Sequence, residues 1–273
     1  MMRPPSLAAL LAMAALSACA DATARGYADY DRYMIQIGHH RLDRNPADAP
    51  FTNADLAENF IRVALAVETM GGQEASAQPL RRWEQPIVYT LFGDGVTPAD
   101  RLLVGAFMDR LAAASGLEIR EGSENINLPI MFLGDAERWQ AHSRVRGGHT
   151  PAMRFLTDFL GRADAENPCR GTLRHNDRYE VVFAAVLIKD EVSGTLRRAC
   201  IEEELAQSLG LTNDDDSVRP SLFNDDQEFA VLTVHDELLL RVLYDRRLRS
   251  GMEEAEVRPL LPRIIRDLRA GES

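Results

Sequence analysis

The chain lacks the signatures of the common enzyme classes and has little positive charge. It contains no G-x-S-x-G elbow, no P-loop and no C-x-x-C pair. These absences argue against a serine hydrolase, a P-loop nucleotide hydrolase and a dithiol oxidoreductase. Its 31 Lys and Arg residues face 42 Asp and Glu residues, so the net charge is −11. We therefore expect no nucleic-acid partner.

Long hydrophobic runs are also scarce, and the clearest one lies at the N-terminus. It extends over 11 residues, from Ser6 to Leu16, and follows the positive charge of Arg3. Such a run is too short to cross a bilayer as a helix, but it has the length of a signal-peptide core. We therefore expect residues 1–18 to form a signal peptide.

The segment Leu16-Ser17-Ala18-Cys19 resembles the lipobox of bacterial lipoproteins. In that motif the cysteine is lipidated and becomes the first residue of the mature protein. The resemblance implies a periplasmic chain anchored to a bacterial envelope membrane through Cys19. The alanine that follows Cys19 favours the outer membrane. The alternative is an ordinary cleaved signal peptide with an incidental cysteine.

Cysteine is rare as well, with three residues in the chain. If Cys19 carries lipid, Cys169 and Cys200 remain, and two cysteines in an oxidising compartment are expected to pair. The bridge would close a loop of about 30 residues and contribute roughly 3–4 kcal/mol to stability. The alternative is a pair of buried free thiols.

Hydrophobic periodicity predicts an α+β fold. Strands are expected at residues 86–92, 117–121, 126–133 and 179–188. Helices are expected at residues 53–68, 98–115, 135–142, 151–160, 196–209, 232–244 and 253–268. Pro129 argues against a central place in the sheet for the strand at 126–133. The layout is a tether at 19–50, an N-terminal helical segment at 51–85, a main domain at 86–252 and a C-terminal helix at 253–273.

The stretch from Cys200 to Asp214 is the most informative part of the main domain. Glu203 and Gln207 lie four residues apart and share one face of the predicted helix, and Gly210 ends it. The opposite face is apolar, with Ile201, Leu205 and Leu209. Two hydrogen-bonding side chains one turn apart, followed by glycine, resemble the H-E-x-x-H-x-x-G motif of zinc peptidases. Both histidine positions carry other residues.

The wider pattern resembles a zincin-type metallopeptidase. The strand at 86–92, the helix after it and the two strands that follow resemble the upper half of that fold. Ser221-Leu222-Phe223 falls where a Met-turn is expected. The resemblance implies a mixed sheet with an upper helix and a degenerate active-site helix, and extra helices at both ends.

A more specific resemblance is to the uncharacterised bacterial DUF2927 family. It is carried by three segments, Glu202–Leu211, Ser221–Asp225 and Leu243–Leu248, and covers roughly residues 86–252. It implies no known activity.

The zincin resemblance also implies where a metal would bind. The ligand positions fall on Glu203, Gln207 and either Asn213 or the neighbouring Asp214, and the general-base position falls on Glu204. Amide side chains are poor zinc ligands, so we expect no zinc here. Without a metal-bound water, Glu204 has no suitable group to deprotonate.

Three functions remain open. The preferred one is a cofactor-free pseudopeptidase that binds an extended peptide or envelope protein along the strand at 126–132, with binding candidates Asn127, Pro129 and Met131. The second is a hydrolase in which Glu203, Gln207 and Asp214 hold calcium, magnesium or manganese and Glu204 acts as the base. The third is a purely structural envelope protein.

A few other features are weaker candidates. His39-His40 in the tether is more simply a solvated pair than a metal site, and His235 is more simply a satisfied histidine than a proton relay. Trp139 and the loop from Arg144 to His149 are weak candidates for a binding loop.

Overall fold

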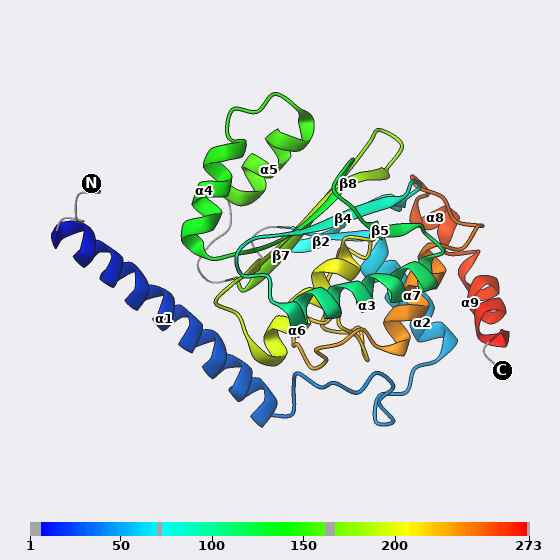
Figure 1. Cartoon of the computed structure of the whole chain (residues 1–273). Coiled ribbons are helices and arrows are strands. Elements are labelled where there is room, and N and C mark those ends of the chain that lie inside the picture. Colours follow the sequence, from blue (N-terminus) through cyan, green and yellow to red (C-terminus); the bar gives the residue numbers. More distant parts are fainter. Residues whose placement is uncertain (1–6, 70–72, 162–166, 272–273) are drawn as a thin grey trace.

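A six-stranded sheet runs through the middle of the molecule, in the computed structural model that describes residues 7–69, 73–161 and 167–271 (Figure 1). The strand order is β3–β8–β6–β4–β5, all parallel, and β7 pairs antiparallel with β8. The strands are β3 (Arg82–Trp83), β4 (Ile87–Phe92), β5 (Ile119–Glu121), β6 (Leu128–Leu133), β7 (Cys169–His175) and β8 (Glu180–Lys189). The predicted combination of helices with a mixed sheet is confirmed.

Strand alternation divides the sheet into two apolar faces, because successive side chains of a strand point to opposite sides. One face carries Leu128, Ile130 and Phe132 of β6 and the matching residues of β4 and β8, and belongs to the main core. The other face carries Met131, Leu133, Phe183, Ala185 and Leu187 and belongs to a second, smaller core cluster.

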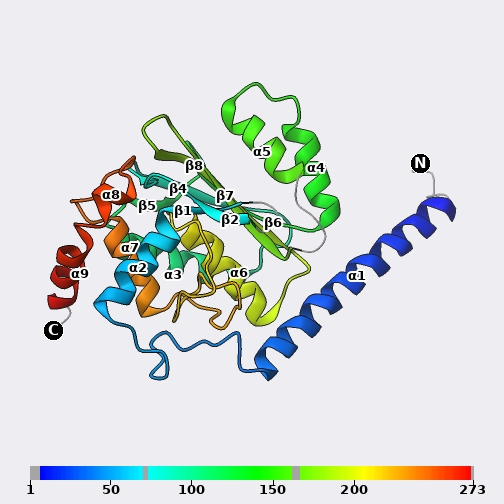
Figure 2. The same ribbon diagram turned by 180° about the vertical axis from the view of Figure 1, so that it is seen from behind.

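Helices cover both faces, as Figures 1 and 2 show from opposite sides. The main core packs against α2 (Asn53–Ala64), α3 (Pro98–Ser115), α6 (Gly194–Gln207), α7 (Val234–Leu243), α8 (Glu254–Val257) and α9 (Leu261–Ala270). The second face is covered by the pair α4 (Asp135–Val145) and α5 (Pro151–Gly161). A small hairpin, β1 (Ala66–Thr69) with β2 (Gln73–Ala77), follows α2.

The helix boundaries follow local signals in the sequence. Thr52, Thr97 and Thr233 each form a capping box with an aspartate three residues later. These side chains satisfy N–H groups that the first helical turn leaves without a partner. Pro98 occupies the first turn of α3, and Gly116 ends that helix in the left-handed conformation. The helix predicted for 98–115 is therefore confirmed.

Several sequence predictions need correction. The helix predicted for 53–68 ends at Ala64, where β1 takes over, and Gly71-Gly72 lies outside the described residues, as do residues 1–6 of the expected signal peptide. Pro129 stands in an internal strand, since β6 pairs with both β4 and β8. The register with β8 begins at Ile130, so the missing N–H of Pro129 falls near the strand start, where it is tolerated.

The segment expected to be a tether, residues 19–50, is partly helical. Helix α1 (Leu7–Gln36) extends through it, and its C-terminal part contacts α6 (Figure 1). Met34 and His40 are buried, so His40 is not the solvated residue that the sequence suggested. Among the described residues, no helix is both long and apolar enough to cross a membrane.

Asp31 of α1 supplies the N-terminal cap that α6 lacks. The N-cap residue Ser193 makes no side-chain cap bond. The carboxylate of Asp31 instead accepts from the backbone N–H groups of Thr195 and Leu196, each at 3.0 Å, and lies 2.7 Å from Nδ1 of buried His40. A carboxylate at this end of a helix also opposes the helix dipole favourably. This contact therefore fixes α1 to the start of α6.

We predict that Asp31→Ala lowers the free energy of unfolding by about 2–3 kcal/mol. About 1–2 kcal/mol comes from the lost cap, and the rest comes from leaving His40 buried without its carboxylate partner. Chemical denaturation measures the change.

Asp29→Ala is the matched control on the same helix. Asp29 is exposed, and in the described part of the chain its ion-pair partner is exposed Arg32 on the helix surface. Its removal should therefore change stability by less than about 0.5 kcal/mol. Equal effects of the two substitutions would contradict the capping role of Asp31.

Candidate functional site

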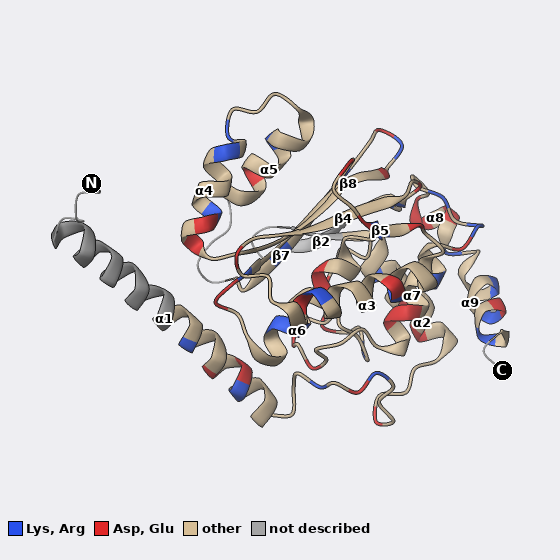
Figure 3. Ribbon diagram, viewed as in Figure 1, with Lys and Arg blue, Asp and Glu red and all other residues tan. Residues whose placement is uncertain are grey.

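Helix α6 begins just after β8 and carries the segment whose sequence resembles the zinc-peptidase motif. Its charges separate along the helix, with Arg197 and Arg198 in the first half and three glutamates in the second (Figure 3). Cys200 lies four residues before Glu204, so both side chains point to the same side of the helix. That side faces β7.

A disulfide joins Cys200 of α6 to Cys169 of β7, as predicted. The two Cα atoms are 5.7 Å apart. The bridge therefore holds the antiparallel strand against the helix that carries the motif.

Glu204, at the general-base position, is buried beneath β7. Only 7% of it is exposed. A Cβ atom added to Gly171 would lie 2.6 Å from Oε2 of Glu204, so a larger residue at this position would require the carboxyl group to shift. Oε2 itself is buried, and the described residues offer it no hydrogen-bond partner. A general base needs a reactant within hydrogen-bond reach, and β7 occupies that side of Glu204.

Burial also changes the protonation of this site. It raises the pKa of Glu204 to about 8, with a further contribution from the charge of Asp214, while Arg170 acts in the opposite direction. Burial and the charges of Asp214, Glu204 and Asp225 raise the pKa of Glu203 well above its usual value. Both shifts follow from the cost of placing negative charges together away from water. Glu204 is therefore mostly protonated at neutral pH.

The three positions carried over as metal ligands come together only in part. Gln207 donates its amide N–H groups to Asp214, with Nε2 at 2.8 and 2.9 Å from the two carboxylate oxygens. Glu203 lies close enough to Asp214 for the negative charge of Asp214 to raise the pKa of Glu203. Asn213 points elsewhere, because its Nδ2 donates to the backbone oxygen of Arg62 at 3.0 Å. Of the two alternatives at this position, only Asp214 joins the cluster.

These residues do not fit a zinc ion. The amide of Gln207 presents N–H donors to Asp214, so its polar end is used within the protein. Within residues 7–69, 73–161 and 167–271, no three His, Cys, Asp or Glu side chains have an arrangement that could hold a metal. The donor set lacks imidazole and thiolate, the ligands that zinc prefers.

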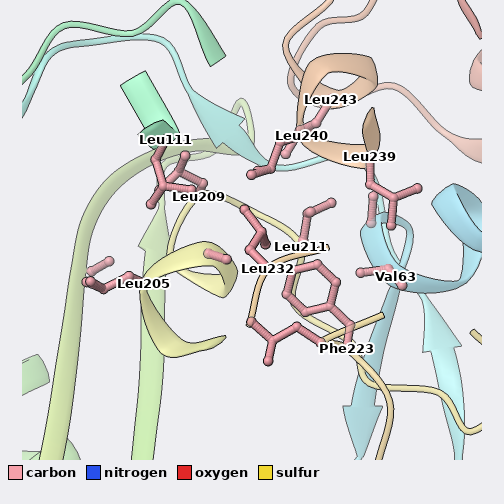
Figure 4. Packing of buried hydrophobic residues seen from close by; sticks show 14 of the residues in the cluster. Val63, Leu111, Leu205, Leu209, Leu211, Phe223, Leu232, Leu239, Leu240 and Leu243 are labelled. Atoms are coloured by element: carbon pink, nitrogen blue, oxygen red, sulfur yellow. The ribbon is translucent and has the colours of Figure 1, made fainter. Parts of the chain in front are cut away.

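The other side of α6 belongs to the main core. Leu205, Leu209 and Leu211 belong to the same buried cluster as Phe223, Leu232 and the leucines of α7, and Figure 4 shows Leu211 close to Phe223 and Leu232. The turn at Ser221-Leu222-Phe223 is held by Asp236, which accepts from the hydroxyl of Ser221 at 2.6 Å and from the backbone N–H of Leu222 at 2.9 Å. This turn therefore has a packing role beneath α6.

The family model for DUF2927, described as a protein of unknown function, matches residues 53–263. The chain belongs to this family. No curated protein matches it significantly. The DUF2927 match includes β7, α6 and the Asp236 turn, and it begins earlier and ends later than the resemblance at 86–252 suggested.

The binding candidates of this DUF2927 protein do not lie on an open sheet edge. Asn127 uses its side chain within the sheet, accepting from the N–H of Val88 at 2.7 Å and donating to the oxygen of Pro86 at 2.9 Å. Pro129 and Met131 lie on internal strand β6 and point to the face covered by α4 and α5. Strand addition needs a free strand edge, and β4 and β8 occupy both edges of β6.

The sequence did not predict β7, which is the strand that covers Glu204. One signal could have found it. Gly171 lies two residues after Cys169, and Glu204 lies four residues after Cys200, so the expected disulfide would have placed Gly171 near Glu204. The side chain of Cys19 is outside what the structure describes.

We predict that Glu204→Gln changes how stability depends on pH. Because the pKa of Glu204 rises from 4.5 to about 8 on folding, folding takes up a proton between these values. The unfolding free energy of the parent therefore falls as pH rises through this window. The free energy of unfolding of the variant minus that of the parent should rise by about 2–4 kcal/mol between pH 5 and pH 8. Urea denaturation across this range measures it.

Glu124→Gln is the control, because Glu124 is exposed. The difference in free energy of unfolding between Glu124→Gln and the parent should stay constant with pH. A constant difference for Glu204→Gln as well would show that Glu204 is charged in the folded protein.

Proposed function

We propose that this chain is a lipid-anchored envelope protein with a zincin-like fold that binds an extended peptide segment without cleaving it. One observation carries the proposal. The residue at the general-base position, Glu204, is covered by Gly171 of a strand that a disulfide ties to the same helix. A peptidase needs that side of the helix open to a substrate and to an activated water.

The zincin-like part of the proposal is supported by the order of elements. A strand, a long helix and two further strands precede the site, as β4, α3, β5 and β6. Strand β8 then leads directly into α6, and the Ser221 turn and α7 follow. This is the order that the resemblance to zincin peptidases implies.

We place the proposed binding surface at the outer edge of β7, because both edges of β6 are paired. Among the described strands, β7 pairs only with β8, and all seven of its residues are partly exposed. An unpaired strand edge presents N–H and C=O groups that an extended peptide can pair with. The peptide would add next to β7, outside the closed site at Glu204.

We predict that the purified protein keeps no zinc and hydrolyses no peptide. Dialysis against zinc followed by metal analysis should leave less than about 0.1 equivalent per chain, since Glu203, Gln207 and Asp214 supply no imidazole or thiolate. A panel of extended peptides should include ligands that stay intact. Their alternately N-methylated forms should not bind, because methylation removes the ladder donors.

Stoichiometric zinc would overturn the non-catalytic proposal. So would peptide turnover that requires calcium, magnesium or manganese and disappears in Glu204→Gln. Equal binding of the methylated peptides would reject strand addition at β7.

The lipoprotein proposal rests on the lipobox-like segment that ends at Cys19. In a bacterial host, mass spectrometry of the mature protein should show an acylated cysteine at its N-terminus, and Cys19→Ser should release the protein from the membrane fraction. Cys200→Ser is the control, because it leaves the proposed lipidation site intact. A mature N-terminus at another residue would reject the anchor.

A further inference from the structure

A cavity lies on the opposite side of the sheet from Glu204. It has a volume of about 550 Å³ and sits between α4, α5 and the second face of the sheet. This is the size of sites that hold small organic ligands, which range from roughly 300 to 1,000 Å³. It shares no residue with the closed site on α6.

Strand alternation makes this cavity apolar. Pro129 and Met131 of β6 and Phe183 of β8 form its floor, and Leu156 of α5 is part of its wall. Its mouth includes Phe92, which is 42% exposed, and Met153, which is 36% exposed. A hydrocarbon chain entering here would remove apolar surface from water on both partners, which favours binding.

Among the described residues, two charged side chains line the cavity, those of Glu137 and Arg144. The two side chains differ in their hydrogen-bond partners. Oε1 of Glu137 accepts from the backbone N–H of Asp94 at 3.1 Å. Arg144 is exposed, and the described residues offer its guanidinium no hydrogen bond or ion pair. The open cationic group at the mouth therefore complements an anion.

We propose that this cavity binds a single-chain aliphatic carboxylate, with the chain along β6 and the carboxylate at Arg144. The apolar floor accepts the chain, and guanidinium groups match the two oxygens of a carboxylate in geometry and charge. The site does not depend on the peptide-binding proposal.

Isothermal titration of the full chain with decanoate, dodecanoate and tetradecanoate tests the proposal, below the concentration at which each forms micelles. Affinity should rise with chain length, by up to about fourfold per methylene, with one ligand per chain. Dodecanol should bind more weakly than dodecanoate, because it lacks the charge.

Two variants locate the ligand. Arg144→Gln should weaken dodecanoate binding by roughly threefold to tenfold and leave dodecanol unchanged. Arg146→Gln is the matched control, because Arg146 is exposed nearby but does not line the cavity. Ala152→Trp places a large side chain at the cavity wall and should weaken every chain length.

Absence of binding by any of the three carboxylates would overturn the proposal. So would affinity that does not change with chain length, or equal effects of Arg144→Gln and Arg146→Gln. Tighter binding of a lysophospholipid with the same chain would replace the carboxylate by a phosphate head group and reject the proposed ligand class.

Discussion

The contact between β7 and α6 determines how Glu204 is covered and how it ionises. The disulfide fixes the strand on the helix, and the missing side chain of Gly171 lets the backbone approach the carboxyl group of Glu204. The helix therefore presents its motif to a strand of its own sheet. A buried carboxyl group without a partner is costly when charged, and the raised pKa of Glu204 is the consequence.

The acidic residues beside this contact, Glu203, Asp214 and Asp225, interact with one another and with Gln207. Gln207 uses its amide on Asp214, and the charges of Asp214 and Asp225 oppose ionisation of Glu203. Helix α1 lies close by, since Glu203 also raises the pKa of Tyr30, after the larger effect of burial. Side chains that would serve as ligands in a peptidase thus satisfy or repel one another.

The two faces of the sheet differ in how completely they are covered. The face toward α3, α6 and α7 forms the main core, in which β4, β6 and β8 contribute alternate residues. The face toward α4 and α5 has a small cluster and keeps an open apolar cavity. The same strand β6 serves both, because its successive side chains point in opposite directions.

The sequence by itself determined the local structure and the pairing of cysteines. Capping boxes at Thr52, Thr97 and Thr233 and the glycine stop at Gly116 define helix ends through bonds made within a few residues. The disulfide was predicted on the premise of an oxidising compartment and a lipidated Cys19, which left Cys169 and Cys200 to pair. The motif on α6 and the family segments could likewise be read along the chain.

Only the tertiary structure decided which strand lies at an edge, what covers Glu204 and where Asn213 points. These outcomes depend on contacts between residues far apart in sequence, such as Gly171 with Glu204 and Asp31 with Leu196. Periodicity shows that a strand has two faces, but it does not show which strands occupy its edges, so β6 was placed at an edge that β4 and β8 fill. Local signals act over one or two turns, whereas the closure of a site depends on the packing of the whole sheet.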